Sequence, residues 1–510
     1  MRFMIALGLG LPILALIICS LSSSEEYTAD YWLEKANSYY NDGSFDIALL
    51  SINKSLEIDP TNADAWMVKG NSFYALNMYK DATDSYNKII QINPTDTKAY
   101  NSKAKALLKL GNYKDAITTS NKSIEINPLD AEAWLGQGNA FYSIGKYRLA
   151  LNSYNNSLDL DSSFWEAWSA KAKIFNLFGK SQEALDASEK ALSLKDDDAE
   201  VWLNKAIALN KMKRYEDARL SSTKSLNISN NALAWTNKGI SLYGLGRNED
   251  ALLSYNEGIK INSSDPVAWA GKGMALSEMG MYEEALTSYN TSLELDKSKS
   301  DIWTRKAQVL NELAMYEEAI VSSTNAIEIN PFDDKAWSNK GNAQYNLGKN
   351  TEALKSFEKT LEINPLDNAA WYSRGLVLVE LGNYEAALDS FDKSTKIDAN
   401  NVASWINRGN VLLKLNRSED AISCYEKALG LNPSSSSAWY GKGVALNETG
   451  KHDEALTSYN KAIEFNPSNA AAWHEKGVVL NSLNSTTESE KALSRANELG
   501  YKNSAKLEEL

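Results

Sequence analysis

The 510-residue chain is poor in the residues that build disulfide frameworks and metal sites. It has two cysteines, Cys19 and Cys424, and two histidines, His452 and His474, and none of the four lies in a metal-binding motif. The formal net charge is −13 and no basic stripe occurs, which argues against nucleic acid as a partner. The sequence therefore predicts no disulfide framework, no metal and no cofactor.

Catalytic motifs are missing as well. No phosphate-binding glycine loop, nucleophile motif or carboxylate pair stands outside the repeated pattern described below, and that pattern takes up nearly the whole sequence. We therefore expect a protein that is not an enzyme.

Only one long apolar run occurs, at residues 3–21. Arg2 precedes it, and three serines followed by Glu25 and Glu26 come after it. A basic start, an apolar stretch and a small polar exit indicate a signal peptide or an N-terminal membrane anchor in residues 1–24. The run is just long enough to span a bilayer. The charges on its two sides place the rest of the chain outside the cytoplasm.

Three fates of this segment stay open. It is an uncleaved anchor, a signal cleaved near Ser20–Ser22 that releases a secreted protein, or a lipoprotein signal ending at Cys19. Ile18 is larger than the residue that a lipoprotein signal usually has just before its cysteine. In each case the predicted membrane contact is made by residues 3–21 only.

The rest of the chain is a repeat. A tryptophan, once a tyrosine, returns every 34 residues, except for one step of 33 between Trp202 and Trp235. The ladder consists of Trp32, Trp66, Tyr100, Trp134, Trp168, Trp202, Trp235, Trp269, Trp303, Trp337, Trp371, Trp405, Trp439 and Trp473. A fixed period of this length indicates one supersecondary unit that is copied and stacked. The short step shortens the loop around residues 229–231 and predicts a local irregularity there.

Other positions repeat in register with the ladder. When the ladder aromatic is numbered position 4, position 8 is always glycine or alanine, and position 20 is alanine in every unit except the last, which has Ser489. Small residues at these places let two helices approach closely, and the ladder aromatics are expected mainly in the core. Position 15 is usually glycine or asparagine, which favours a helix ending in a left-handed turn. Position 32 is often proline, which ends the second helix.

The pattern of tryptophan, small residue, alanine, aromatic residue and proline resembles the tetratricopeptide repeat over about Thr28 to Tyr501. The resemblance implies an all-α solenoid, a right-handed superhelix of helix-turn-helix repeats. The apolar run at residues 3–21 predicts an N-terminal hydrophobic helix before it. We place fourteen repeats in residues 25–500 as one solenoid. Residues 501–510 are expected to form a short C-terminal capping tail.

In that family the first helices line a concave groove, and positions 2, 5, 6, 9, 12 and 13 point into it. Here these positions are rich in asparagine and tyrosine, which combine amide donors and acceptors with amphipathic rings. The resemblance implies partner-binding roles for Asn37, Asn71, Asn139, Asn204, Asn237, Asn339, Asn342, Asn407, Asn410, Tyr40, Tyr74, Tyr142, Tyr345, Tyr372 and Tyr440. The alternative is that these side chains only solvate the groove and bond neighbouring helices.

The resemblance predicts a scaffold that binds extended segments of partner proteins, which are neutral or cationic to suit the net charge. The lysine and arginine set that clamps a terminal carboxylate in some relatives is missing: Arg305, for example, is opposed by Asp301. Two alternatives are a non-catalytic, substrate-presenting subunit of an enzyme or secretion complex, and a cell-surface structural protein. Trp165, off the ladder, is expected to pack over a helix junction, or else to form an exposed anchor.

Overall fold

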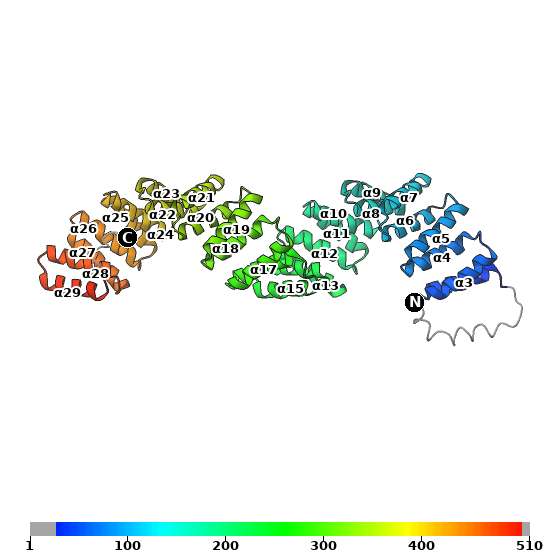
Figure 1. Cartoon of the computed structure of the whole chain (residues 1–510), viewed down its shortest axis with the longest axis horizontal. Coiled ribbons are helices and arrows are strands. Elements are labelled where there is room, and N and C mark those ends of the chain that lie inside the picture. The colour runs from blue at the N-terminus through cyan, green and yellow to red at the C-terminus, as the bar shows by residue number, and fades with distance from the viewer. Residues whose placement is uncertain (1–26, 502–510) are drawn as a thin grey trace, which may run out of the picture. The chain divides into compact units, whose positions relative to one another are not determined.

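A computed structural model describes residues 27–501, which are helical with no strand among them. The helices have 13 or 14 residues each and form a row of helix hairpins within each part of the chain (Figure 1). The first helices of the repeats are α2 (Ala29–Asn41), α4 (Ala63–Ala75), α6 (Thr97–Lys109), α8 (Ala131–Ser143), α10 (Trp165–Leu177), α12 (Ala199–Lys211), α14 (Ala232–Gly244), α16 (Pro266–Glu278), α18 (Ser300–Glu312), α20 (Asp334–Asn346), α22 (Asn368–Glu380), α24 (Val402–Lys414), α26 (Ser436–Glu448) and α28 (Ala470–Ser482). The second helices are α3 (Phe45–Ile58), α5 (Tyr79–Ile92), α7 (Tyr113–Ile126), α9 (Tyr147–Leu160), α11 (Ser181–Leu194), α13 (Tyr215–Ile228), α15 (Asn248–Ile261), α17 (Tyr282–Leu295), α19 (Tyr316–Ile329), α21 (Asn350–Ile363), α23 (Tyr384–Ile397), α25 (Ser418–Leu431), α27 (His452–Phe465) and α29 (Thr486–Glu498).

Several predictions concern residues outside this range. The predicted hydrophobic helix, the signal or anchor in residues 1–24 and all but the first residue of the predicted tail lie outside the described residues. Within residues 27–501, no helix combines the length and the apolar character needed to cross a bilayer. The same residues contain no cluster of metal-ligating side chains.

The contacts divide the chain into two compact units, Met1–Leu245 and Gly246–Leu510, whose described helices are α2–α14 and α15–α29. Within each unit every helix packs on the next, and the first helices of most consecutive repeats also touch. Examples are α10 with α12 and α12 with α14 in the first unit, and α18 with α20 in the second. The first helices therefore lie side by side along much of each unit. One solenoid over residues 25–500 stays a prediction.

The turn within each repeat confirms the expectation for position 15. All fourteen residues at this position have a positive φ, including Lys213 at 60° and Ala314 at 55°. After α18, the Met315 N–H donates to the Leu310 carbonyl at 2.8 Å, which closes the helix end around Ala314. A lysine and an alanine therefore adopt a conformation that the other repeats give to glycine or asparagine.

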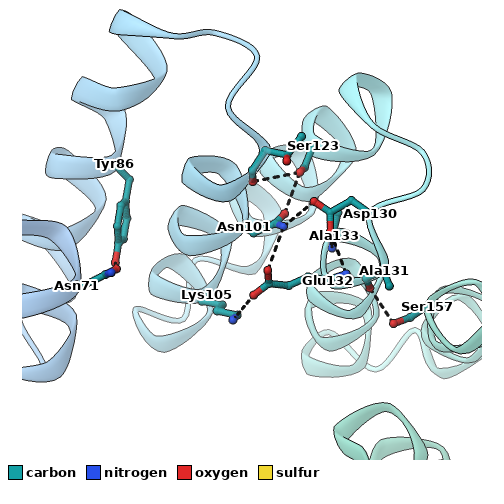
Figure 2. A network of polar contacts seen from close by, with 11 residues as sticks. Asn71, Tyr86, Asn101, Lys105, Ser123, Asp130, Ala131, Glu132, Ala133 and Ser157 are labelled. Carbon is teal, nitrogen blue, oxygen red and sulfur yellow. Dashed lines mark hydrogen bonds and ion pairs between the residues drawn. The ribbon is translucent and has the colours of Figure 1, made fainter. Parts of the chain in front are cut away.

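Most first helices begin with a side-chain cap that the sequence analysis did not single out. The residue before the helix is usually Asp, Asn or Ser, and its side chain accepts a backbone N–H of the first turn. Asp130, for example, accepts from the Ala133 N–H at 3.3 Å (Figure 2). Phe164 and Lys299 stand at the same position without such a bond, so α10 and α18 begin without a side-chain cap.

The core of a repeat is the contact between positions 8 and 24. Where position 8 is glycine, a large side chain covers it: a Cβ at Gly341 would lie 2.8 Å from Phe357 Cε1. Where position 8 is alanine, position 24 is small or aliphatic, as in Ala104 with Ser120. The two arrangements fill the same space in different ways, because one methyl group at position 8 takes the room of a ring edge.

The ladder tryptophans are partly buried, and several of them, such as Trp303 and Trp439, pack against the core clusters, as expected in part. The indole also ties its helix to the preceding loop, because Nε1 donates to the carbonyl six residues earlier. Trp337 donates to the Pro331 carbonyl at 3.1 Å in this way. Trp235, after the 33-residue step, donates to the Asn230 side chain at 2.7 Å instead. The contact of this tryptophan therefore differs at the short step, and an irregularity of the superhelix there stays a prediction.

Candidate partner-binding surface

All of the predicted binding residues lie on first helices. In the first unit they are on α2 (Asn37, Tyr40), α4 (Asn71, Tyr74), α8 (Asn139, Tyr142), α12 (Asn204) and α14 (Asn237). In the second unit they are on α20 (Asn339, Asn342, Tyr345), α22 (Tyr372), α24 (Asn407, Asn410) and α26 (Tyr440). Their binding role stays a prediction, but their contacts differ in ways that decide which of them a partner can reach.

The asparagines at position 9 hold the core tyrosines. Asn71 Oδ1 accepts a hydrogen bond from the Tyr86 hydroxyl at 2.8 Å (Figure 2). The same bond joins Tyr154 to Asn139 at 2.9 Å and Tyr425 to Asn410 at 2.7 Å. A buried phenol needs such a partner, and burial raises the pKa of Tyr86 well above its usual value. These three amides therefore have a packing role that the first-helix pattern alone did not reveal.

The asparagines at position 6 join neighbouring first helices. Asn204 and Asn237 are buried. The backbone carbonyl of Asn204 accepts a hydrogen bond from Asn176 Nδ2 at 2.8 Å, and the carbonyl of Asn237 accepts one from Asn210 Nδ2 at 2.9 Å. In the second unit, Asn407 Nδ2 donates to the Tyr372 hydroxyl at 3.2 Å. Little surface of Asn204 and Asn237 is left for a partner, whereas Asn407 is half-buried.

The predicted tyrosines pack along their own repeats. The rings of Tyr40, Tyr74 and Tyr142 lie 5.4, 5.3 and 5.4 Å from the aromatic residue that begins the following second helix. Burial raises the pKa of the Tyr142, Tyr345 and Tyr372 phenols, which favours their neutral form. Tyr440 is buried against Tyr459. The half-buried tyrosines offer a ring edge and a neutral hydroxyl.

Two adjoining cavities open on the first helices of the first unit. The larger, about 610 Å³, lies along α10, α12 and the start of α14. The smaller, about 230 Å³, includes Asn139 and Trp165. Tyr142, Lys173 and Glu200 line both. The structure thus brings Asn139 and Tyr142 together in one cavity, and Tyr142 and Asn204 in the other.

The lining also contains residues that the sequence analysis missed. Lys173 at position 9 forms an ion pair with Glu200 at position 2 of the next repeat, and Lys105 pairs with Glu132 in the same way (Figure 2). A lysine and a glutamate 27 residues apart are the signal that would have found these pairs. Trp165 lies at the α9–α10 junction and also lines the smaller cavity, with Lys195 Nζ 4.4 Å from its ring centroid.

A third cavity, about 280 Å³, lies on the first helices of the second unit. Asn407, Asn410 and Tyr440 line it together with Ile406 and Asn469. None of the three cavities is lined by the other predicted residues, which are Asn37, Asn71, Asn237, Asn339, Asn342, Tyr40, Tyr74, Tyr345 and Tyr372.

Comparison with known proteins gives the following matches. The tetratricopeptide repeat family matches residues 29–62, 63–96, 85–118, 135–199, 266–299, 300–333, 338–402 and 406–470, more than half of the chain. Solved structures that resemble the chain include YrrB, described as a TPR protein with an unusual peptide-binding site, with 23% identity, 37% of this chain and 97% of YrrB covered, and a TM-score of 0.35. The APC/C hetero-tetramer Cut9–Hcn1 has 17% identity and a TM-score of 0.43, and the match covers 95% of this chain and 98% of the matched chain. MamA from Desulfovibrio magneticus RS-1 has 22% identity and a TM-score of 0.32, and the match covers 32% of this chain and 94% of MamA. These likenesses concern the fold alone, and no curated protein matches.

Proposed function

Because the chain belongs to the tetratricopeptide repeat family, we propose that it is a scaffold that binds extended segments of partner proteins along its first helices. The observation that carries this proposal is that the first-helix surface of each unit is hollowed and lined by amides, tyrosines and aliphatic side chains. Such a lining combines apolar contact with hydrogen bonds to a peptide backbone. A right-handed superhelical stack would let contacts add up over successive repeats.

The finer features of the proposal follow from composition and family. Net charge of −13 favours neutral or cationic partners. Tetratricopeptide repeat proteins are generally non-catalytic scaffolds, and we propose that this chain does no chemistry of its own.

Site-specific crosslinking tests the scaffold proposal. A photoreactive benzoylphenylalanine replaces Leu177 in α10 or Asn342 in α20 of the full chain, each at a first-helix position. Matched controls carry it at the exposed Leu50 in α3 and Val321 in α19, which are second helices. We expect one partner set to crosslink from the first-helix sites. Crosslinks confined to the second-helix sites would contradict the proposal.

We also propose that residues 1–24 direct the repeats across a membrane, as an anchor or as a cleaved signal. The support is the order of Arg2, the apolar run 3–21 and the acidic pair at 25–26. Protease added to intact cells should digest the repeats, and a cytoplasmic marker should survive. Full protection of the repeats until the cells are permeabilised would refute export. The mass of the mature chain distinguishes an uncleaved anchor, which keeps residues 1–24, from a cleaved signal, which is lost.

A further inference from the structure

Glutamates at position 2 of three consecutive repeats differ in one respect. Glu132 pairs with Lys105, and Glu200 pairs with Lys173. Each lysine comes from position 9 of the repeat before, 27 residues earlier. Glu166, the exposed glutamate between these two, forms no ion pair within residues 27–501. The repeat therefore has a place for an ammonium beside this glutamate, and at Glu166 no lysine of the chain takes it.

The residue that stands where the lysine would be is Asn139. Its side chain is neutral, and its Oδ1 accepts a hydrogen bond from the Tyr154 hydroxyl at 2.9 Å. An asparagine cannot neutralise Glu166, and it is shorter than a lysine. Asn139 and Glu166 both line the smaller cavity, of about 230 Å³. The cavity therefore opens beside the glutamate that lacks a lysine.

The lining of this cavity is acidic. Glu166, Asp198 and Glu200 contribute three carboxylates to it. Lys173 is the one lysine among the lining residues, and Glu200 already pairs with it. Because the carboxylates outnumber the ammonium, a cation that enters the cavity is attracted and an anion is repelled.

A buried hydroxyl is a second, independent sign of a ligand. Ser169 lines the same cavity and is 7% exposed. Its hydroxyl makes no hydrogen bond to any residue of 27–501. It is not one of the fully sealed, unpaired polar atoms of these residues, such as Ser120 Oγ, so it opens on the cavity. Buried hydroxyls normally have a partner, and the N–H group of a cation would provide one.

The cavity also offers apolar surface to the stem of a long side chain. Trp165 and Ala170 belong to its lining. Lys195 Nζ lies 4.4 Å from the Trp165 ring centroid and pairs with Asp197 at 3.9 Å, so it does not neutralise Glu166. Lysine and arginine place their stems on apolar surface of this kind while the charged end stays among polar groups.

We propose that the smaller cavity of the first unit receives one cationic side chain of a partner protein, a lysine or an arginine, which pairs with Glu166. The charged end takes the place that Lys105 takes beside Glu132, and one of its N–H groups donates to the Ser169 hydroxyl. The stem lies along Trp165. The inference rests on the proposed scaffold function and names the side-chain chemistry that one part of the first-helix surface selects.

The chain contains a matched control for Glu166. Asp301 in α18 stands at the same repeat position, and the residue 27 positions earlier is Met274, which is not a lysine either. Asp301 belongs to the second unit and lines none of the three cavities. Asp301→Asn therefore removes a carboxylate from position 2 without touching the proposed site.

The experiment uses the full chain in detergent micelles, with fluorinated tryptophan at every tryptophan. Trp165→Phe assigns the Trp165 fluorine resonance. The probe is the peptide acetyl-Ala-Ala-Lys-Ala-Ala-amide, and matched peptides carry arginine or norleucine in place of lysine. Norleucine keeps the aliphatic stem and lacks the charge. We expect the lysine and arginine peptides to shift the Trp165 resonance saturably, with a Kd about three- to five-fold lower than that of the norleucine peptide, the factor that one exposed ion pair supplies.

Two variants test the part played by Glu166. Glu166→Gln should abolish the preference for lysine over norleucine, whereas Asp301→Asn should leave it unchanged. Asn139→Lys supplies an internal ammonium in the place that the partner's cation would take. It is made together with Tyr154→Phe, so that no hydroxyl loses its acceptor. The double variant should show a smaller lysine preference than Tyr154→Phe alone.

Three outcomes would overturn the inference: equal Kd values for the lysine and norleucine peptides, a lysine preference that survives Glu166→Gln, or the same loss of preference in Asp301→Asn. Peptides that leave the Trp165 resonance unmoved would overturn it as well. Partner crosslinks from Leu177 and Asn342 report separately on the scaffold proposal. Crosslinks that persist without a lysine preference would reject the cavity assignment alone. Crosslinks confined to the second helices would reject the scaffold proposal whatever the peptides do.

Discussion

At the scale of single residues, the repeats show where a side chain departs from what its position requires. Position 15 needs a left-handed backbone, and glycine adopts it without penalty. Ala314 adopts φ of 55° at this position, in a turn whose hydrogen bonds are those of its neighbours. The residue therefore stores strain that the glycine repeats lack.

Ala314→Gly is expected to stabilise the protein by about 1 kcal/mol, because it removes the left-handed strain of an alanine at a small entropic cost. The reverse change at the same position, Gly348→Ala, should destabilise by a similar amount. An added Cβ at Gly348 meets nothing within 4 Å, so its effect is purely conformational. Urea unfolding followed by circular dichroism measures both. If both variants changed the free energy of unfolding in the same direction, the argument would be contradicted.

The Asn71–Tyr86 pair allows a second residue-scale prediction. Asn71→Ala leaves the buried Tyr86 hydroxyl without its acceptor and should cost about 1–3 kcal/mol. Tyr86→Phe in that background removes the stranded hydroxyl, so the double variant should be more stable than Asn71→Ala alone. A double-mutant cycle in urea gives the coupling energy, expected at about 1 kcal/mol. Additive effects would show that Asn71 does not support the core.

At the scale of elements, the helix hairpin is built on a choice between two packings. A glycine at position 8 accepts a ring at position 24, or Leu493 in the last repeat, and an alanine accepts a serine or an aliphatic residue. Gly70 lies against Tyr86 and Gly375 against Phe391, whereas Ala172 lies in the same repeat as Ser188. This pairing also explains why glycine persists inside helices, where it costs about 1 kcal/mol relative to alanine.

Gly341→Ala tests the pairing. The new methyl group would lie 2.8 Å from the Phe357 ring, so overpacking of about 1–3 kcal/mol should outweigh the gain in helix propensity. In a Phe357→Ser background the ring is gone, and the same Gly341→Ala change should become stabilising. The reversal of sign in thermal unfolding is the expected result. A glycine-to-alanine effect of the same sign in both backgrounds would reject the steric account.

At the scale of the whole molecule, stability is a sum over repeats and their interfaces, so features that recur have additive effects. Buried tyrosines recur at position 24 in both units. Burial raises the pKa of the Tyr86, Tyr154, Tyr425 and Tyr459 phenols above the ordinary value. The unfolded chain loses these protons near pH ~10, whereas the folded chain keeps them.

Alkaline pH should therefore unfold the protein. Below about pH 10 both states hold the phenol protons, and stability from these groups is fully present. As pH rises from there toward the folded pKa values, the unfolded state binds fewer protons and stability falls. Melting temperatures measured at rising pH should drop, and tyrosinate absorbance should appear together with the loss of helix. The fourfold Tyr→Phe variant should show a flatter dependence, and an equal dependence would contradict this origin.

The sequence by itself determined the period, the helix hairpins and the turns. These features follow from local rules repeated fourteen times, such as left-handed residues at position 15 and small residues at positions 8 and 20. The 33-residue step lies where Trp235 bonds the Asn230 side chain instead of a backbone carbonyl, a contact that the sequence alone did not predict. These local rules can be inferred from a single sequence because its fourteen repeats can be compared with one another position by position.

Only the tertiary structure decided which first-helix side chains are open to a partner. Asn71 is engaged by a tyrosine 15 residues away, and Asn204 is buried by the repeat before it. The ladder tryptophans are half-buried, and an indole such as that of Trp337 donates to a carbonyl of the loop before its helix. The cavity at Asn176 is formed by side chains from four consecutive repeats. Exposure and hydrogen bonding depend on what the neighbouring repeat places opposite a residue, and that is a property of the packing.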